Sequence, residues 1–426
     1  MNIQSLITPP PNLRLKARIK STQLALGEEK RSSALLISSF PNRTKSLDNE
    51  YPYHPSPDLF YLTGSAELGL SILITNREKR PILFSRPRSK QEIVWDGDLR
   101  SAKDVAKAID AELIESSDQS SEILKKLKGI ETLFFGNAPG TVSANIVKQL
   151  IDRAPHQRVG VPSRFIFADK LLGPLRAIKD KSEIDAIGRS VYITGQAIAD
   201  AFPYIQPGMT ESALAGIVEL GFRGRGAVCA FNSIIATGAA AATLHYSALS
   251  RTLRKGEMVL IDVGASKDMY CGDLTRVFPV GGELSSTQKG LFEIVEAAKE
   301  AAIRTVRHGV PISKVHDAAA MVISYGLKEL KLLKGTASQI FKNKSYREFF
   351  PHGIGHPLGL DVHDLGLERS TERPNNEQIL KKGMVITIEP GIYLPKKIGE
   401  FSPCGIRLED DVLVTNSGCE VFATDI

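Results

Sequence analysis

Two stretches in the second half of the chain share one pattern of hydrophobic and polar positions. Each begins with Lys-Gly, continues with five mostly apolar residues and ends with an acid, one further residue and Gly, as in KGEMVLIDVG (255–264) and KGMVITIEPG (382–391). Apolar runs bounded by glycines predict buried strands, because β-branched and long apolar side chains suit a covered pleated surface. The pattern therefore predicts two related strands that end in Asp262 and Glu389.

A second acid follows each of these strands. Asp273 comes after a polar turn that contains glycine, and Glu409 comes after a longer loop. Antiparallel hairpins would place Asp262 beside Asp273 and Glu389 beside Glu409. A single buried acid would also fit a turn or a paired structural charge, but the repetition disfavours that interpretation. If the two halves pack about a pseudo-twofold axis, four carboxylates meet, and two divalent cations are the natural way to keep them ionised.

The first third of the chain alternates short apolar runs with helical or polar stretches, which predicts an α/β domain. The predicted strands are Ala34–Ser38, Leu70–Thr75, Pro81–Phe84 and Thr132–Phe135, and the predicted helices are 101–112, 119–128 and 141–153. The aromatic and proline-rich stretch 49–64 predicts a packed irregular loop. Residues 154–175 are punctuated by Pro and Gly, which indicates a connection between domains.

The second domain repeats one order of elements. Residues 178–202 have apolar positions at helical spacing, and Thr210 is a plausible N-cap of the next helix. The pattern returns as a helix over 286–308, a Pro/Gly break, and another helix from Ser313 to about Leu330. A helix pair followed by a strand with an acid at its end thus occurs twice, which indicates an internal duplication.

Composition narrows the classes of protein that remain. The 426 residues, 42% hydrophobic and 24% charged, predict a soluble protein of about two or three domains. The net charge of +6 includes no basic run, so nucleic-acid binding is not expected. No apolar stretch approaches the ~18 residues that a membrane span requires. Four cysteines without metal-finger spacing favour reduced thiols and a cytoplasmic protein, although the acid-free residues 1–27 leave a targeting segment open.

Histidines gather directly before the second strand. Three of the eight histidines, His352, His356 and His363, fall within twelve residues of the sequence HGIGHPLGLDVHD. The glycines argue against a helix here, so His352 and His356 are not a helical pair. An isolated histidine is more often structural than a ligand, but a cluster beside four acids reverses that expectation. His245, which stands 17 residues before Asp262, is the approximate counterpart in the first half.

These motifs resemble those of the pita-bread metallopeptidases and, among them, the Xaa-Pro aminopeptidases (aminopeptidase P). The resemblance runs from about residue 10 to the C-terminus. It covers five contexts, LIDVG, GDLTR, HGIGHPLG, TIEPG and RLEDD. In these contexts, five residues stand where that family has its dinuclear metal ligands, namely Asp262, Asp273, His356, Glu389 and Glu409.

The resemblance implies two domains. Residues 1–170 would form an α/β domain of the creatinase/aminopeptidase P type, involved in oligomerisation and substrate access. Residues 176–426 would form an α+β catalytic pita-bread domain with a pseudo-twofold internal repeat. A homo-oligomer, either a dimer or a tetramer, is implied in the same way.

One imidazole and four carboxylates form a hard, oxygen-rich site, which suits Mn²⁺ and tolerates Co²⁺ or Zn²⁺. By resemblance, Asp273 and Glu409 bridge the two ions, Asp262 chelates one, and His356 with Glu389 completes the other. A water that bridges both ions would lose a proton near neutral pH and act as the nucleophile. The resemblance also implies that Glu389 is the general acid/base.

Further residues resemble the family's outer site. His363 would donate a hydrogen bond to the developing oxyanion. His245, His352 and Arg407 would orient substrate and relay protons, although Arg407 could instead neutralise one of the acids that follow it. Trp95 stands in VWDGDL, where the family often places an aromatic residue that reaches a neighbouring subunit's site. The alternative for Trp95 is a place in the core of the N-terminal domain.

The function implied is that of a hydrolase, a metal-dependent aminopeptidase that releases the first residue of peptides with proline in second position. The nearest alternative is a prolidase, which cleaves only Xaa-Pro dipeptides. An alternative of another class is a catalytically silent pita-bread module that binds partners. The complete set of ligands and outer histidines argues against the silent module.

Overall fold

The computed structural model describes residues 9–10, 12–97, 101–154, 161–366 and 378–424. It divides into two compact units, residues 1–176 and 177–426. Within the described ranges, no helix combines the length and the hydropathy that crossing a membrane would require. Part of the basic N-terminal stretch, residues 1–8 and 11, lies outside the described residues.

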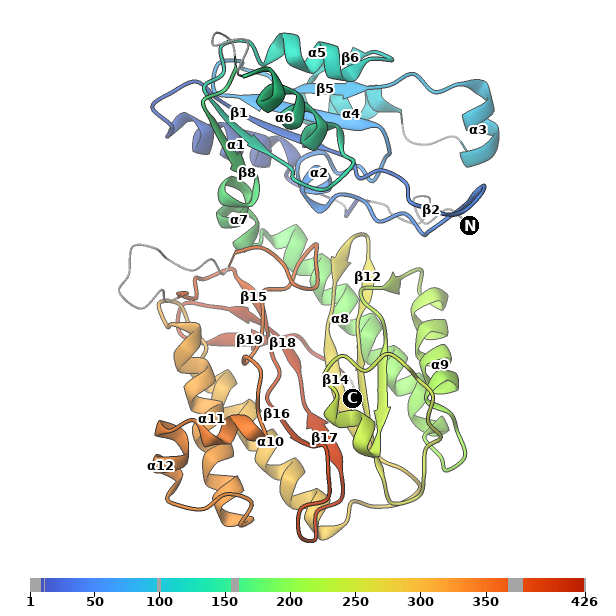
Figure 1. Cartoon of the computed structure of the whole chain (residues 1–426), viewed down its shortest axis with the longest axis vertical. Coiled ribbons are helices and arrows are strands. Elements are labelled where there is room, and N and C mark those ends of the chain that lie inside the picture. The colour runs from blue at the N-terminus through green and yellow to red at the C-terminus, as the bar shows by residue number, and fades with distance from the viewer. Residues whose placement is uncertain (1–8, 11, 98–100, 155–160, 367–377, 425–426) are drawn as a thin grey trace. The chain divides into compact units, whose positions relative to one another are not determined.

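The N-terminal unit is built on a six-stranded mixed sheet with the order β6-β5-β4-β1-β7-β8 (Figure 1). Its strands are β1 (Ser33–Ser38), β4 (Leu70–Thr75), β5 (Ile82–Ser85), β6 (Glu112–Glu115), β7 (Thr132–Phe135) and β8 (Arg164–Phe167). The pairs β1–β4 and β4–β5 are antiparallel. The pairs β5–β6, β1–β7 and β7–β8 are parallel. A separate hairpin joins β2 (Thr44–Ser46) to β3 (Asn49–Glu50).

Helices cover both faces of this sheet. They are α1 (Leu15–Gly27), α2 (Pro57–Thr63), α4 (Ala102–Ile109), α5 (Gln119–Lys126) and α6 (Val142–Arg153). The two remaining helices, α3 (Lys90–Asp96) and α7 (Asp169–Ala177), lie away from the faces of the sheet (Figure 1). Helices α1, α2 and α4 contact one another, while α5 and α6 form a second group. Alternate sheet residues, such as Leu36 and Phe84, share one buried cluster with Ile123 of α5 and Ile146 of α6. This is the α/β domain that the sequence predicted.

Three segments of this unit differ from prediction. The predicted helix 101–112 ends at Ile109, and Glu112 begins strand β6. The predicted irregular loop 49–64 contains the buried helix α2, because Ser56 caps it by accepting from the Leu59 N–H and Pro57 suits its first turn. The predicted connection 154–175 contains β8 and most of α7. Strand β8 pairs in parallel with β7, a partner that the local sequence does not reveal.

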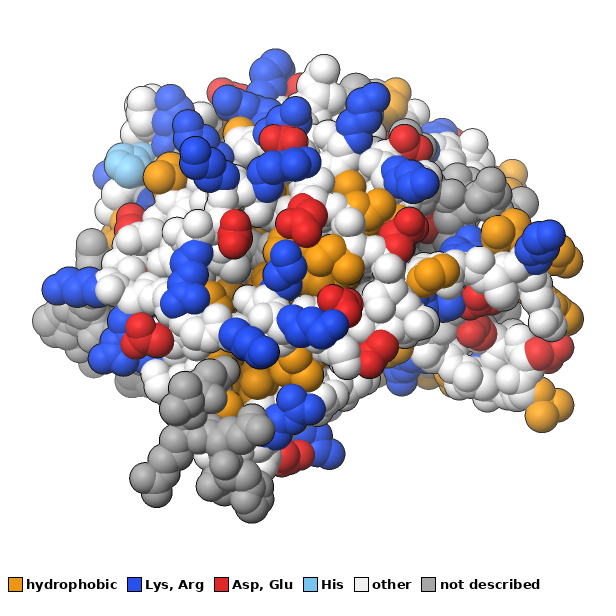
Figure 2. Space-filling view, turned by 90° about the horizontal axis from the view of Figure 1, so that it is seen from above, with side chains coloured by type: hydrophobic (Ala, Val, Ile, Leu, Met, Phe, Trp, Pro, Cys, Tyr) orange, Lys and Arg blue, Asp and Glu red, His pale blue; other side chains and the backbone are white. Residues whose placement is uncertain are grey.

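The surface shown in Figure 2 mixes charges of both signs. Lys and Arg side chains are interspersed with Asp, Glu and small apolar areas, and no broad region of this face is of one sign. Such a mixed distribution is typical of a solvated surface.

The C-terminal unit contains the predicted duplication. Its first half comprises α8 (Lys181–Ala201), α9 (Glu211–Gly224), β9 (Val228–Cys229), β10 (Ile234–Thr237), β11 (Met258–Val263), β12 (Ala265–Lys267), β13 (Tyr270–Cys271) and β14 (Leu274–Pro279). Its second half comprises α10 (Ser286–Thr305), α11 (Ile312–Glu329), α12 (Ala337–Lys342), β15 (Val385–Ile388), β16 (Gly391–Leu394), β17 (Cys404–Arg407), β18 (Asp410–Val414) and β19 (Cys419–Val421). Helices α8 and α9 pack together in one half, as α10 and α11 do in the other (Figure 1).

The predicted helix starts are nearly right in this unit. Thr210 is the N-cap of α9 and accepts from the Ala213 N–H at 3.1 Å. Helix α11 begins at Ile312, one residue before the predicted start, and Pro311 precedes it without a side-chain cap. Helix α10 ends at Thr305 rather than at residue 308.

Two antiparallel hairpins place the four acids as predicted. Strand β11 pairs with β14 so that Asp262 faces Thr275, which puts Asp273 diagonally across on the same face. Strand β15 pairs with β18 up to Ile388 and Asp410, and the same register continues through a Leu408 N–H···O=C Pro390 bond into β16 and β17. Glu389 and Glu409 are therefore direct neighbours across the two strands.

Candidate active site

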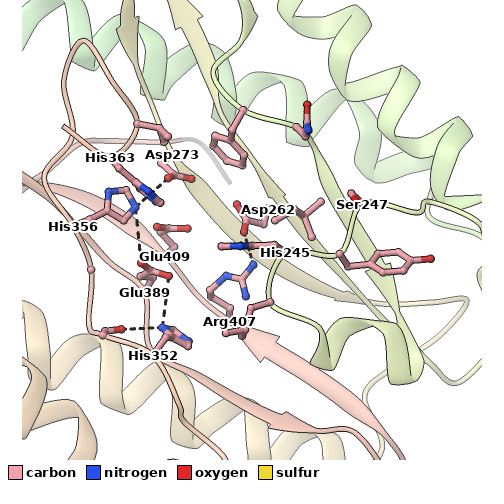
Figure 3. A pocket seen from close by; sticks show the side chains of 18 residues that line it. His245, Ser247, Asp262, Asp273, His352, His356, His363, Glu389, Arg407 and Glu409 are labelled. Atoms are coloured by element: carbon pink, nitrogen blue, oxygen red, sulfur yellow. Dashed lines mark hydrogen bonds and ion pairs between the residues drawn. The ribbon is translucent and has the colours of Figure 1, made fainter. Parts of the chain in front are cut away.

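One pocket of about 580 Å³ in the C-terminal unit brings the predicted residues together (Figure 3). Both halves of the duplication contribute side chains to its wall. It is lined by all nine predicted site residues of this unit, namely His245, Asp262, Asp273, His352, His356, His363, Glu389, Arg407 and Glu409. Residues more than 160 positions apart in sequence therefore share one cavity.

Three of the predicted metal ligands form a compact group. Asp273, His356 and Glu409 each offer one ligand atom, and these atoms lie within 4.8 Å of one another. The His356 Nε2 lies 3.6 Å from Asp273 Oδ2 and 3.9 Å from Oε1 of Glu389. Such a set of carboxylate and imidazole donors suits a divalent ion.

Asp262 is held by Arg407, whose guanidinium donates to its Oδ2. Burial alone would lower the pKa of Arg407, but the carboxylate of Asp262 and the hydroxyl of Tyr393 raise it well above its ordinary value. The charge of Arg407 also opposes the rise in the pKa of Glu409 that burial and Asp262 cause, in keeping with the alternative that Arg407 neutralises this following acid. Asp410 receives Arg276 and Lys299 instead.

The clustered carboxylates resist ionisation. Burial and the nearby Glu409 raise the pKa of Glu389 to about 8, and burial with Asp262 raises that of Glu409 to about 7. Burial and the same neighbours raise the pKa of Asp273 well above its usual range. Divalent cations would remove this penalty, because they stabilise the ionised form of every carboxylate that they contact.

Asp273 has an unsatisfied oxygen that fits a metal ligand. The residue is 4% exposed, and its Oδ1 has no hydrogen-bond partner among the described residues. A buried carboxylate oxygen without a partner is costly unless a cation meets it. The donor set and this oxygen therefore fit a divalent metal ion.

Two residues outside the predicted set form hydrogen bonds with the predicted ligands Asp273 and Glu409. Asp411 accepts from the Asp273 N–H at 2.9 Å, and Thr275 donates to Glu409 Oε2 at 2.6 Å. Burial and the charge of Asp273 raise the pKa of Asp411 well above its usual range. The run RLEDD signalled an extra buried acid here, whereas nothing in the sequence identified Thr275.

Tyr393 of β16 is a further residue that the sequence did not identify. Its hydroxyl accepts from Arg407 Nη1 at 2.9 Å and lies 2.8 Å from His352 Nε2. Burial, followed by the charge of Arg407, lowers the pKa of His352 to about 4. His352 is therefore neutral near neutral pH, and Tyr393 connects it to the Arg407–Asp262 pair.

The segment that contains His352, His356 and His363 packs closely against strand β15. His356 N–H donates to Thr387 Oγ1 at 3.2 Å, and a Cβ on the preceding Gly355 would lie 1.9 Å from the Thr387 carbonyl oxygen. The rings of His356 and His363 have centroids 4.2 Å apart. Burial, followed by the charge of His356, lowers the pKa of His363, which favours a neutral ring that can donate one hydrogen bond.

Trp95 lies in the N-terminal unit, on helix α3, and not among the residues that line the pocket. Its side chain is 73% exposed, so the alternative that it belongs to the core of that domain is wrong. Its assignment to the substrate site stays a prediction.

Two family models match the chain. The model of metallopeptidase family M24 matches residues 185–416, which include all nine site residues of the C-terminal unit, from His245 to Glu409. The chain belongs to metallopeptidase family M24. The model of the aminopeptidase P N-terminal domain matches residues 14–134. The predicted family and fold class, an α/β domain followed by a pita-bread domain, are confirmed.

Relatives and solved structures agree with this membership. The Xaa-Pro aminopeptidase of Escherichia coli (strain K12) is 31% identical over 92% of this chain and 91% of its own length. The structure of aminopeptidase P from E. coli with the inhibitor Pro-Leu has a TM-score of 0.86 at 29% identity, covering 96% of this chain and 94% of that one. Proline aminopeptidase P II from Yersinia pestis gives 0.87 at 29% identity, covering 95% of each chain.

The raised carboxyl pKa values predict how pH changes the stability of the metal-free protein. Glu389 and Glu409 hold protons in the folded state up to about pH 8 and 7, above their unfolded pKa near 4.5. The stability that they contribute is therefore full below about pH 4.5 and is lost as pH rises through 7 to 8. Thermal unfolding after chelation should show Tm falling from pH 5 to 8.5, and the gain in Tm on adding Mn²⁺ should grow over the same range. A Tm of the chelated protein that stays level or rises between pH 6 and 8.5 would contradict this account.

Proposed function

We propose that the protein is a metal-dependent Xaa-Pro aminopeptidase, which removes the first residue of peptides whose second residue is proline. The convergence of Asp273, His356 and Glu409 in one pocket, with an unpartnered oxygen on Asp273, is the observation that carries this proposal. The similarity to Xaa-Pro aminopeptidases over most of the chain supports the choice of substrate.

Two divalent ions, preferably Mn²⁺, would be held by the five predicted ligands Asp262, Asp273, His356, Glu389 and Glu409. Once bound, they would supply a water activated for attack and a polarised scissile carbonyl. Glu389 would accept the proton released in the attack and return it to the leaving proline nitrogen, as a carboxylate positioned beside the reacting groups can do in general acid–base catalysis. His363 donates a hydrogen bond to the oxyanion that develops on the carbonyl.

The outer residues orient the peptide. His245 and His352 line the same pocket as the ligands, and the Tyr393 hydroxyl joins His352 to Arg407. A proline after the scissile bond provides no N–H to hold, so these side chains must position the substrate through its carbonyl groups and its shape. Trp95, from the exposed face of α3, is proposed to contribute to the substrate site of a homo-oligomer.

The charge of the pocket favours an aminopeptidase over a prolidase. Among the described residues that line the pocket, Arg407 is the one Lys or Arg, and it is committed to Asp262 and Tyr393. A dipeptidase needs a cation for the proline carboxylate, and the described lining offers none that is not already paired. The N-terminal domain is proposed to serve oligomerisation and substrate access, and the cytoplasm is the proposed location.

Substitutions distinguish a metal ligand, Asp273, from a residue that acts on the substrate without binding metal, His363. Asp273→Asn should lose bound metal together with activity, because Asp273 would be a metal ligand and an amide lacks the negative charge that holds a divalent ion. His363→Ala should keep its metal and lose ~10²–10³ in kcat, the usual scale for one oxyanion donor. Metal content by elemental analysis and turnover of an Xaa-Pro-Xaa tripeptide measure both effects. A metal-free His363→Ala protein, or one with nearly full turnover, would show that this role is wrongly assigned.

Substrate length distinguishes the aminopeptidase from the prolidase. A third residue moves the terminal carboxylate ~3.5 Å further along the chain and places a peptide bond where the dipeptide has its charge. Without a free cation in the pocket, we expect a higher kcat/KM for Xaa-Pro-Xaa than for the matching Xaa-Pro, measured with Mn²⁺ near pH 8. Cleavage confined to the dipeptide would make the protein a prolidase.

A further inference from the structure

Residues 238–251, the first part of the connection between β10 and β11, form a loop that carries His245 to the wall of the pocket. It begins with the 3-10 helix η3 (Gly238–Ala242), and residues 243–250 belong to no helix or strand. Tyr246 and Ser247 line the pocket beside His245 (Figure 3). A side chain that acts on substrate must be held to within about 0.5 Å, so this irregular segment needs support from elsewhere.

Glu211, the first residue of α9, holds the loop at three points. Its Oε1 accepts from the backbone N–H of Thr237, directly before the loop, at 2.9 Å. Its Oε2 accepts from the Tyr246 hydroxyl at 2.8 Å and from the backbone N–H of Arg251 at 2.9 Å. One carboxylate thus fixes the beginning, the middle and the end of the segment that carries His245.

Glu211 is itself fixed in place and enclosed. Its side chain is 0% exposed, and its own N–H donates to the carbonyl of Arg251 at 3.0 Å. Thr210 and Thr252 form a β-bridge next to this bond. The carboxylate therefore connects two segments whose backbones already run side by side.

A role in stabilising the start of α9 does not explain this arrangement. Acids in the first turn of a helix are favoured by the helix dipole, but an exposed side chain suffices for that effect. Thr210 already caps α9 through the Ala213 N–H. The three hydrogen bonds accepted by the Glu211 side chain come from residues of the loop and its two ends, and not from α9.

We propose that Glu211 is a positioning residue that fixes His245 through Tyr246 and the two ends of the loop. The inference rests on the proposed function in one respect, namely that His245 acts on the bound peptide. Glu211→Gln keeps the shape of the side chain. Whichever way its amide is turned, however, the NH₂ group faces the N–H of either Thr237 or Arg251, so one end of the loop is released.

Hydrogen exchange of the full-length, Mn²⁺-loaded protein tests the contact without any assay of activity. In Glu211→Gln, the amides of Thr237 and Arg251 and the segment 238–251 should exchange at least about tenfold faster than in the wild type. Glu183→Gln is the matched control. Glu183 is also buried and accepts from a backbone N–H, that of Asp180, and a tyrosine hydroxyl, that of Tyr270, each at 3.0 Å.

The control should accelerate exchange at the start of α8 and leave the segment 238–251 as in the wild type. Wild-type exchange of this segment in folded Glu211→Gln would overturn the proposal. An equal acceleration in both variants would also overturn it, because the effect would then be a general loss of stability.

A kinetic cycle tests whether Glu211 acts through His245. Glu211→Gln should lower kcat/KM for an Xaa-Pro-Xaa tripeptide roughly 10²-fold, the scale expected when a working group is displaced by about 1 Å. The double variant with His245→Ala should be no slower than His245→Ala alone, since both changes remove the same contribution. Losses that multiply would overturn the proposal. A wild-type protein that cleaves no Xaa-Pro peptide would refute the proposed function instead and leave the exchange result standing.

Tyr246→Phe provides the test if Glu211→Gln does not fold. It deletes one hydroxyl and keeps the ring and both backbone contacts of Glu211. The same hydroxyl accepts from the Ser250 N–H at 3.2 Å, so the informative rise in exchange is the one expected at residues 243–247, away from Ser250. The loss in kcat/KM should again fail to add to that of His245→Ala. Wild-type exchange and wild-type kinetics in Tyr246→Phe would overturn the proposal.

Discussion

Four carboxylates that the fold brings together in one pocket are the constraint on which the catalytic unit depends. Asp262, Asp273 and Glu409 are buried, and Glu389 lies against them. Their mutual repulsion and their desolvation are costly, so the surrounding residues must supply protons, cations or donors. Arg407, which donates to Asp262, and Thr275, which donates to Glu409, are the part of that compensation that the chain itself provides. The remainder falls to the metal ions that the family name implies.

Compensation of this kind works only if the carboxylates are held in place, and strand register does this. Asp262 and Asp273 share one face of a hairpin, and Glu389 and Glu409 face each other across a second. The N–H of Glu409 donates to the carbonyl of Thr275, which joins the two hairpins directly at the site. The duplication therefore matters for function, because neither half contains the full set of donors.

The sequence predicted the parts of this arrangement that are written locally. The repeated apolar strands, the acids at their ends and the histidine cluster each have a local signature, and the hairpins follow from them. Features formed by distant partners were missed. Helix α2 was hidden by its prolines and aromatic residues, and β8 depends on its pairing with β7. Tyr393 and Glu211 look like ordinary strand and helix residues until the fold places them beside His352 and Tyr246.

The register that continues through β15–β16 and β17–β18 has a consequence for how relatives of this chain can differ. The turn between Leu394 and Cys404 can lengthen or shorten without moving Glu389 relative to Glu409, because the pairing on both sides of the acids is unaffected. A single residue inserted between Arg407 and Asp410 would turn the following side chains to the opposite face of the sheet. A change of length in the turn therefore leaves the site intact, whereas a change of length between Arg407 and Asp410 would move the acids out of it.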